Sequence, residues 1–411
     1  MTKFFPKLYY GWIVAWALAI SEPISWGILF YGFGVMVNPT QAEMGWSRAE
    51  ITGAFSLAML ISGLTAVPVG RWLDRHGARG LMTVGSILAT LLVVAWANVQ
   101  SLLGFYVVWA GIGVIMAAVL YEPAFAVIAT WFVRKRTSAL TVLTFGGGLA
   151  SVVFVPLATW MVGQYGWRQA LLMLAGLLAV TTIPIHGLLL RRDPAAVGSV
   201  PDGDLSPAMM AGAQHRVEVN SSVGEALRSA NFWWISNAFS LSVFAAVTLS
   251  VHLLPFLTER GYSAGFAAGV ASVLGGSQIP GRLVFGPIAN RLSLRVTTAL
   301  LFVSMTAGVL ILFFAPTGWL TLVGAVLFGS GSGASSPARA ALVAEIYGVK
   351  NYGSINGFIA LAQTVAKAIA PVGMGLLYTW WGGYAPVFWT LAAASLGAVG
   401  SILLLGKGRK S

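Results

Sequence analysis

Five ionisable residues interrupt the long apolar runs of this chain: Glu22, Glu122, Arg282, Arg339 and Lys367. A charged side chain at the centre of a bilayer costs about 2.5–3.5 kcal/mol even on the most lenient insertion scale, so each should face a partner or a water-filled cavity. Arginine offers a planar fork that matches a carboxylate, and lysine adds a point charge. A buried carboxyl group is suited to carrying a proton or to neutralising a cation.

The two cations Arg282 and Lys367 fall on different predicted helices of the second half of the chain. Lys367 lies about 20 Å from the inner end of its span and Arg282 about 9 Å, at 1.5 Å per residue. We predict that the two side chains bind one carboxylate between them. Two alternatives stay open: snorkelling of Arg282 to the inner surface, and a structural pair between Lys367 and an acid such as Glu22.

The acids have two possible roles. Glu22 precedes Pro23 in the middle of the first span, and it either carries a coupling proton or neutralises Arg282 or Lys367. Glu122 and Arg339 occupy related depths in spans four and ten, and we expect them to form a structural or gating charge pair.

Four uncharged polar residues complete the candidate binding site: Tyr121, Gln278, Tyr31 and Asn356. Each can hydrogen-bond to a ligand, and each can equally make an interhelical polar contact.

The composition requires a membrane to position these residues. The chain has 411 residues, of which 57% are hydrophobic and 9% are charged, with a mean hydropathy of +0.82. Soluble domains carry roughly 25% charged residues, so lipid must solvate much of this surface. The absence of cysteine excludes disulfides and thiolate chemistry.

Twelve segments are long and apolar enough to cross a bilayer as helices of about 20 residues. They are 10–37, 49–70, 80–98, 102–130, 139–163, 168–190, 231–257, 263–288, 296–315, 318–345, 352–377 and 384–405. The sequence therefore predicts an all-α membrane protein with an N-terminal six-helix bundle (1–190), a cytoplasmic linker (191–230) and a C-terminal six-helix bundle (231–411).

The basic residues predict the orientation. With the N-terminus in the cytoplasm, only Arg48, Arg168 and Arg260 fall in outer loops, and three more of the 24 lysines and arginines fall inside spans. The others lie on the inner side: Lys3, Lys7, Arg71, Arg75, Arg79, Arg134, Lys135, Arg136, Arg191, Arg192, Arg216, Arg228, Arg291, Arg295, Lys350, Lys407, Arg409 and Lys410. This bias predicts a multi-pass protein of the cell membrane with both termini cytoplasmic. The net charge of +12 is then a topology signal, so no nucleic-acid partner is expected.

The two halves repeat each other. "GRWLDRHGAR" follows span two and "GPIANRLSLR" follows span eight, with Gly70 and Gly286 separated by 216 positions. Pro123 and Pro337 are 214 apart, and Pro156 and Pro371 are 215 apart. Such internal repeats are typical of carriers in which two bundles move around a site near the membrane midplane.

"GRWLDRHGAR" resembles the loop signature of the major facilitator superfamily, with Gly70, Asp74, Arg75, Gly77 and Arg79 at the matching positions and Ala78 where a basic residue is frequent. The resemblance implies the major facilitator fold over the whole chain. It also implies a conformational role for the loop, in which the aspartate faces a helix N-terminus and the arginines bind neighbouring carboxylates.

The stretches "YYGWIVAWALAI", "WFVRKRTSALTVLTFGGGLAS" and "YGWRQALLMLAG" resemble the group of monocarboxylate carriers and oxalate–formate exchangers. In that group an arginine in span eight precedes a glycine by four residues, as Arg282 precedes Gly286, and the exchangers add a lysine that Lys367 matches. Two positions depart: Gln278 stands where an aspartate is frequent, and span one has Glu22 in place of a lysine.

Other features predict no catalysis. There is no zinc-protease, nucleophile-elbow or nucleotide-binding motif, and the four histidines (His76, His186, His215 and His252) are scattered. We therefore expect no enzyme, catalytic residue, metal or cofactor. Gly329 and Gly333 have the spacing of close helix packing. Trp46, Trp167, Trp319 and Trp380 lie near span ends and are predicted as interfacial anchors.

These observations predict a monomeric secondary active transporter of a small organic anion, a mono- or dicarboxylate. It would work by alternating access, driven by a proton or a counter-solute gradient, with lipid as its surroundings. The alternative is a major facilitator carrier of a larger neutral or aromatic solute, such as a vitamin or a drug-like compound, in uptake or efflux.

Overall fold

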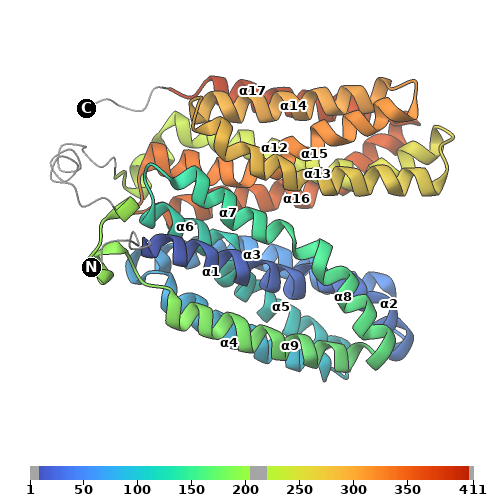
Figure 1. Cartoon of the computed structure of the whole chain (residues 1–411). Helices are drawn as coiled ribbons and strands as arrows, with labels where there is room; N and C mark the ends of the chain where they lie inside the picture. Colours follow the sequence, from blue (N-terminus) through green and yellow to red (C-terminus); the bar gives the residue numbers. More distant parts are fainter. Residues whose placement is uncertain (1–8, 204–219, 407–411) are drawn as a thin grey trace, which may run out of the picture. The chain divides into compact units, whose positions relative to one another are not determined.

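The computed structural model describes residues 9–203 and 220–406, which form helices joined by short loops, with no strand among them (Figure 1). The all-α fold class is therefore confirmed. Some of the basic residues that predict the orientation lie outside the described residues: Lys3, Lys7, Arg216, Lys407, Arg409 and Lys410. His215 and the middle of the predicted linker, 204–219, also lie outside them.

The chain forms two compact units. Unit 1 comprises Met1–Asn220 together with Tyr347–Phe358, and unit 2 comprises Ser221–Ile346 together with Ile359–Ser411. The boundary after Asn220 falls inside the predicted linker (191–230). The short segment Tyr347–Phe358, which the sequence predicts in the second bundle, packs with unit 1.

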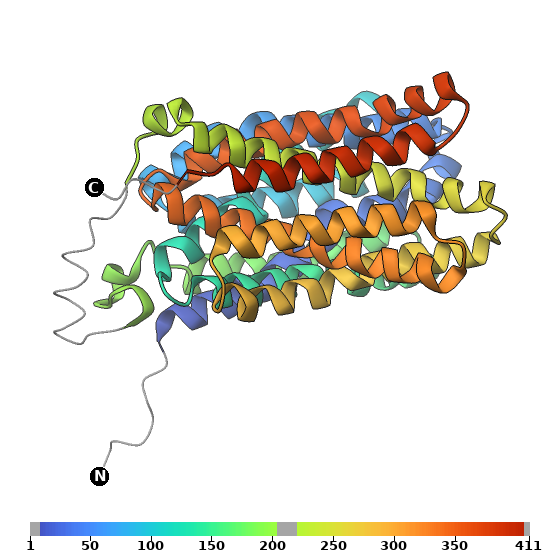
Figure 2. The ribbon, with the colours of Figure 1, turned by 90° about the horizontal axis from the view of Figure 1, so that it is seen from above.

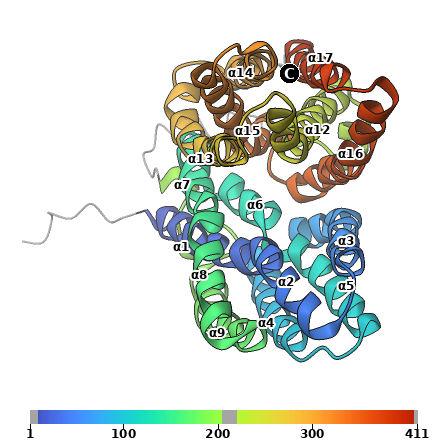
Figure 3. The same cartoon turned by 90° about the vertical axis from the view of Figure 1, so that its right-hand side faces the viewer.

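Unit 1 contains six helical stretches, three of which are interrupted. They are α1 (Tyr10–Trp26), π-helix η1 (Gly27–Tyr31) and α2 (Gly32–Met44); α3 (Arg48–His76); α4 (Ala78–Ala97); α5 (Leu102–Val119) and α6 (Tyr121–Trp131); α7 (Arg136–Gly148) and α8 (Ala150–Tyr165); and α9 (Trp167–Pro184) with π-helix η2 (Ile185–Leu189). α4 packs against α9, and Figure 3 shows the two helices next to each other.

Unit 2 contains six long helices, seen nearly end-on in Figure 3 and lengthwise in yellow to red in Figure 2. They are α12 (Ala230–Glu259), α13 (Ala264–Ala289), α14 (Leu294–Phe314), α15 (Gly318–Tyr347), α16 (Tyr352–Trp381) and α17 (Ala385–Leu403). The short helix α11 (Val223–Arg228) precedes α12 and begins with a capping box, in which the Ser222 and Glu225 side chains accept each other's backbone N–H groups.

Each of the twelve predicted spans corresponds to one of these stretches within the described residues. Ten of them are long and apolar enough to cross a membrane, and the other two are α13 and α15. Those two helices carry Arg282 and Arg339 and are rich in glycine and serine, which lowers their hydropathy.

The core of unit 1 contains a cluster of aromatic side chains. Phe33 stacks on Phe55 with ring centroids 4.6 Å apart, and Trp96 meets Trp109 edge-on at 4.8 Å. Such pairs add about 0.5–1.5 kcal/mol each beyond the burial of their area. Trp167 belongs to the same core with 4% exposure, so its prediction as an interfacial anchor was wrong, while Trp319 and Trp380 are exposed as that role requires.

The first part of the linker is bound to unit 1. It contains two short 3₁₀ turns, η3 (Pro194–Val197) and η4 (Pro201–Gly203). The Asp202 carboxylate accepts hydrogen bonds from three consecutive backbone N–H groups, those of Val133 at 3.2 Å, Arg134 at 2.8 Å and Lys135 at 3.1 Å. Its side chain is only 4% exposed. Successive backbone N–H groups form such anion-binding concavities, so Asp202 anchors the linker to the loop between α6 and α7.

Candidate functional site

The acid on α1 is the most deeply enclosed of the candidate residues. Glu22 is 1% exposed, and neither of its carboxyl oxygens has a hydrogen-bond partner within the part of the chain that the structure describes. The indole N–H of Trp26, one turn later, lies near this carboxyl group but outside hydrogen-bonding geometry. Pro23 follows directly and removes the backbone donor that would bind the Ala19 carbonyl.

A second acid lies close to the first. Glu122 begins α6 and interacts electrostatically with Glu22. Its carboxylate accepts a hydrogen bond from the side-chain amide of Asn356, which is 1% exposed in the α16 segment that belongs to unit 1. The structure therefore brings Glu22, Glu122 and Asn356 into one polar group.

Aromatic rings border this group of acids. The Trp26 ring lies 5.0 Å from that of Tyr121 and 5.3 Å from that of Phe30. Phe30 in turn lies 5.1 Å from Tyr31, at the end of η1. Tyr121, predicted as a ligand-binding residue, thus contacts Trp26, one turn after Glu22. Tyr31, predicted for the same role, lies further along, in η1.

The Arg282 guanidinium of unit 2 donates to a backbone carbonyl and to a side-chain amide oxygen. Arg282 on α13 is 9% exposed, and its Nε donates to the carbonyl oxygen of Gly333 on α15 at 3.2 Å. Its Nη2 donates to the side-chain oxygen of Gln278 at 3.5 Å. Gln278, predicted as a ligand donor, therefore orients the guanidinium from one turn earlier on the same helix.

Close contact between α13 and α15 makes this arrangement possible. A Cβ atom on Gly281 would lie 2.1 Å from the carbonyl oxygen of Ser330, and one on Gly333 would lie 2.4 Å from that of Gln278. The predicted packing role of Gly329 and Gly333 is thereby confirmed, since a Cβ on Gly329 would lie 2.2 Å from the Leu274 carbonyl oxygen.

The other two cations within the predicted spans of unit 2 occupy different environments. Arg339 on α15 is 4% exposed, whereas Lys367 on α16 is exposed. The contacts that orient Arg282 run to Gln278 and Gly333, so a joint clamp of Arg282 and Lys367 on one carboxylate stays a prediction. The pairing of Glu122 with Arg339 is likewise a prediction.

The signature loop between α3 and α4 binds the start of α16. The Asp74 carboxylate accepts from the backbone N–H groups of Gly353 at 2.7 Å and Ser354 at 2.8 Å, and from the Ser354 hydroxyl at 2.5 Å. An anion at a helix N-terminus satisfies its free N–H groups and opposes the helix dipole. Gly70 permits this contact, because a Cβ there would lie 2.1 Å from the Gly353 carbonyl oxygen.

The remaining signature residues shape the same loop. Gly77 has a φ of +78°, which other residues rarely adopt. Arg79 donates from Nε to the carbonyl oxygen of Gly187 in η2 at 2.9 Å. Arg75 is exposed, and its carbonyl oxygen accepts from Arg192 at 3.4 Å.

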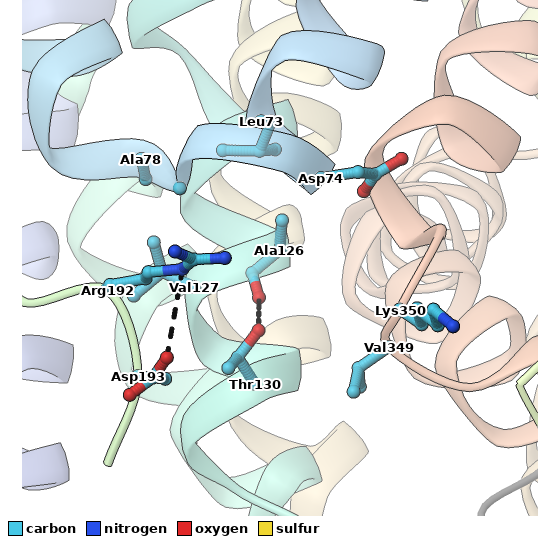
Figure 4. A pocket seen from close by; sticks show the side chains of 11 residues that line it. Leu73, Asp74, Ala78, Ala126, Val127, Thr130, Arg192, Asp193, Val349 and Lys350 are labelled. Atoms are coloured by element: carbon cyan, nitrogen blue, oxygen red, sulfur yellow. Dashed lines mark hydrogen bonds and ion pairs between the residues drawn. The ribbon is translucent and has the colours of Figure 1, made fainter. Parts of the chain in front are cut away.

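A pocket of about 200 Å³ opens at this loop (Figure 4). Figure 4 shows Asp74 from α3, Thr130 from α6, Arg192 and Asp193 after η2, and Lys350 before α16 around it. Both signs of charge line it, and Arg192 already contacts Asp193 at 3.8 Å. The pocket is therefore part of the loop assembly and contains neither Arg282 nor Glu22.

Two buried or half-buried clusters escaped the sequence analysis. His186 in η2 is fully buried, with Nδ1 2.8 Å from the Ser86 hydroxyl and Nε2 3.0 Å from the Ser21 hydroxyl. At the other end of unit 1, Glu43 accepts from Trp167 at 2.5 Å and from Arg168 at 2.7 Å. An ionisable residue in an apolar span was the available signal for His186, but nothing in the sequence pairs it with Ser21 or Ser86.

Comparison with known proteins identifies the fold and the family. A profile of the Major Facilitator Superfamily matches residues 15–321 and 277–410. The chain is 25% identical to monocarboxylate transporter 13 of Bos taurus, covering 97% of this chain and 88% of that protein. It is 27% identical to monocarboxylate transporter 11 of Mus musculus, covering 97% and 87% respectively.

Solved structures show the same architecture. The fucose:proton symporter of E. coli matches with a TM-score of 0.73 at 16% identity, over 97% of this chain and all of that one. A proton:xylose symporter matches with a TM-score of 0.74 at 13% identity, over 98% of both chains. At such identities the likeness shows the fold alone. With the family profile spanning nearly the whole sequence, the chain belongs to the major facilitator superfamily and is a multi-pass membrane transporter of small solutes.

Proposed function

We propose that this transporter carries a small organic anion, a mono- or dicarboxylate, by alternating access coupled to a proton or a counter-solute gradient. The observation that carries the proposal is Arg282, a buried guanidinium oriented by the Gln278 side chain and the Gly333 carbonyl oxygen. A guanidinium fixed in a plane is preorganised for two parallel hydrogen bonds to a carboxylate. Relatives named monocarboxylate transporters support the same substrate class.

Lys367 supplies the second positive charge in this proposal. A flexible ammonium group reaches a bound carboxylate from another helix, and its long-range attraction favours an anionic cargo over a neutral one. Tyr121, Tyr31 and Asn356 then provide hydrogen bonds that set the shape of the accepted anion. A dicarboxylate would engage both cations, and a monocarboxylate Arg282 first.

Glu22 is the proton carrier in this proposal. Its carboxyl group is enclosed without a hydrogen-bond partner among the described residues, and Glu122 lies within electrostatic reach. A carboxyl group enclosed in an apolar site is suited to carrying a proton, because its charged form is costly there. Glu122, held by Asn356, remains the gating partner proposed for Arg339.

The signature loop controls the conformational change in this proposal. Asp74 stabilises the start of α16 through three hydrogen bonds, and breaking them would accompany the switch between access states. We further propose that the transporter is a monomer in the cell membrane with both termini in the cytoplasm, as the distribution of lysine and arginine favours.

Transport by the purified full-length chain in proteoliposomes tests the substrate class. Labelled lactate and succinate serve as anionic probes, and nicotinamide serves as a neutral aromatic probe. We expect saturable uptake of an anion and at least a tenfold loss in Arg282→Gln, because an unpaired buried carboxylate costs several kcal/mol. Arg282→Lys should recover part of the charge but not the planar fork.

The matched control is Arg228→Gln, at an exposed arginine that ends α11. It removes the same charge outside the apolar spans and should leave uptake within about twofold of the parent, as exposed charges contribute little. Uptake of nicotinamide alone, or full anion transport by folded Arg282→Gln protein, would contradict the proposal.

A further inference from the structure

His186 joins three helical elements of unit 1 through its ring. Its Nδ1 lies 2.8 Å from the Ser86 hydroxyl and 3.3 Å from the Met82 carbonyl oxygen, both on α4. Its Nε2 lies 3.0 Å from the hydroxyl of Ser21 on α1. All three side chains are at most 1% exposed. A buried polar network of this kind fixes geometry only when each member is satisfied, and both ring nitrogens of His186 have a partner.

The turn that carries His186 is itself held in place. η2 is a π-helical turn that follows Pro184, and such turns recur at functional sites. Its carbonyl groups accept from Arg79 at Gly187, from Tyr10 at Leu189 (2.9 Å), and from Arg191 at Leu188 (2.6 Å). One of these donors, Arg79, belongs to the signature loop. It binds the carbonyl oxygen of Gly187, the residue directly after His186.

The partner on α1 is the residue directly before the proposed proton carrier. Ser21 precedes Glu22, and Pro23 follows it. On another side of this turn, Gly146 of α7 comes so close that a Cβ would lie 2.1 Å from the Ala19 carbonyl oxygen. Because Pro23 cannot bond to that carbonyl, the helix itself restrains this turn less than usual. The His186–Ser21 hydrogen bond and the Gly146 contact restrain it from outside.

We propose that His186 is a positioning residue, which through Ser21 holds the turn of α1 that presents Glu22 for proton binding and release. The inference rests on the proposed function, because it requires Glu22 to carry the coupling proton. His186 touches neither the proton carrier nor the substrate site in this scheme. The ionisable groups on the elements packed against it are Glu22 and Tyr10 on α1, Arg79 on α4, Arg168 at the start of α9, and Arg191 after η2.

The test compares two transport modes of the purified chain in proteoliposomes, with lactate and succinate as probes. Net uptake driven by a pH gradient requires the proton to leave its carrier, whereas exchange of labelled for unlabelled substrate does not. His186→Leu removes every polar contact of the ring, including the hydrogen bond to Ser21. We expect net uptake to fall about fivefold, the equivalent of one lost hydrogen bond, with exchange within about twofold of the parent.

Two further variants make the readout specific. His186→Gln keeps one donor and one acceptor on a side chain of similar reach and should restore net uptake. Ser21→Ala should reproduce the His186→Leu phenotype, and the double variant should be no worse than either single one, because all three break the same bond. Thr182→Val is the matched control: Thr182 is fully buried one turn earlier, and among the described residues its hydroxyl donates only to the Leu178 carbonyl of its own helix.

The outcomes separate this inference from the proposed function. If Glu22→Gln retains pH-driven net uptake, Glu22 is not the proton carrier and the proposed coupling fails. If Glu22→Gln loses net uptake but His186→Leu lowers net uptake and exchange by the same factor, His186 is only structural. Where His186→Leu does not fold, His186→Gln and Ser21→Ala decide, and a parent-like ratio of net uptake to exchange in Ser21→Ala overturns the inference.

Discussion

The acids within the apolar spans lie in unit 1, and the cations within the apolar spans lie in unit 2. Unit 1 contains Glu22 and Glu122 within its spans, while unit 2 contains Arg282, Arg339 and Lys367. Neutral groups hold several of these side chains: the Asn356 amide donates to Glu122, and the Gln278 side chain and the Gly333 carbonyl accept from Arg282. Under the proposed function, unit 1 provides the proton carrier and unit 2 provides the two cations that bind the anion.

The ends of the two units that carry Glu43 and Glu259 show a second difference between repeat-related positions. Glu43 and Glu259, 216 positions apart, each end the first stretch of their half. Glu43 forms an ion pair with Arg168 at 2.7 Å, whereas Glu259 accepts from the Tyr378 hydroxyl at 2.6 Å. Carbonyl groups at the end of the third helical stretch are bound by Arg168 in unit 1 and by Arg260 in unit 2. In both units an arginine thus binds these carbonyl groups, but the carboxylate is bound by an arginine in unit 1 and by a tyrosine in unit 2.

Replacing the Arg282 cation by an acid should have the largest effect on anion uptake. We expect Arg282→Glu to reduce lactate or succinate uptake in proteoliposomes more than about a hundredfold, because like charges at a desolvated site cost several kcal/mol. Folding is checked by the elution profile in detergent. Retained anion uptake by a folded Arg282→Glu protein would show that the sign of charge in unit 2 does not select the cargo.

The contacts of Arg168 and Arg260 should contribute different amounts to the free energy of unfolding. Arg168 donates to the carbonyl oxygens of Ala97 and Val99 as well as to Glu43. We expect Arg168→Gln to lower the free energy of unfolding by about 2 kcal/mol, mostly through lost charged hydrogen bonds to carbonyls, since the half-exposed ion pair adds little. Arg260→Gln should cost about half as much. Thermal unfolding in detergent measures both, and equal losses would argue against the difference.

The signature loop offers a substitution that makes unit 1 resemble unit 2. In the second copy, "GPIANRLSLR", Asn290 stands at the position of Asp74. We expect Asp74→Asn to weaken the cap on α16 and to raise hydrogen exchange of the Gly353 and Ser354 amides about tenfold, because a charged acceptor becomes neutral. Hydrogen exchange with mass spectrometry tests this, with the α17 peptides as the internal reference.

Two tyrosines provide the smallest expected effect. Burial and the nearby Asp202 carboxylate raise the pKa of Tyr9 above its usual value, and burial together with Glu259 raises the pKa of Tyr384 to about 12. The folded state therefore holds these protons more tightly than the unfolded state. Their contribution is complete below about pH 10 and is lost as pH rises towards the folded pKa values. Tyr9→Phe and Tyr384→Phe should each flatten the loss of thermal stability above pH 10.

Hydropathy and charge bias predicted much of the architecture, because spans and loops are local properties of the sequence. The count of twelve helical stretches and the membrane class follow from apolar length. The interruptions in α1, α5 and α7 did not follow, since a π-turn such as η1 depends on how Pro23 and its neighbours pack. Span ends shifted too: the first span extends to Met44 and not to residue 37.

The candidate site was predictable only as an inventory of residues. Depth in an apolar run was enough to select Glu22, Glu122 and Arg282, because the cost of burying a charge can be judged from the position of a residue along the sequence. Partners depend on the packing of distant segments, so the Asn356–Glu122 and His186–Ser21 contacts could not be predicted. Trp167 shows the same limit, because its position at a span end concealed a buried contact with Glu43.

The hydrogen bonds of Asp202 attach the first part of the predicted linker to unit 1, so this part does not serve as a free connection between the halves. The Asp202 carboxylate binds the segment from Arg191 to Gly203 to unit 1. Within this segment the Asp193 side chain caps η3 by accepting from the Ala196 N–H at 3.0 Å. A reporter, affinity tag or protease site inserted within those thirteen positions would disturb a built surface. Engineering of the tether between the halves should therefore begin beyond Gly203.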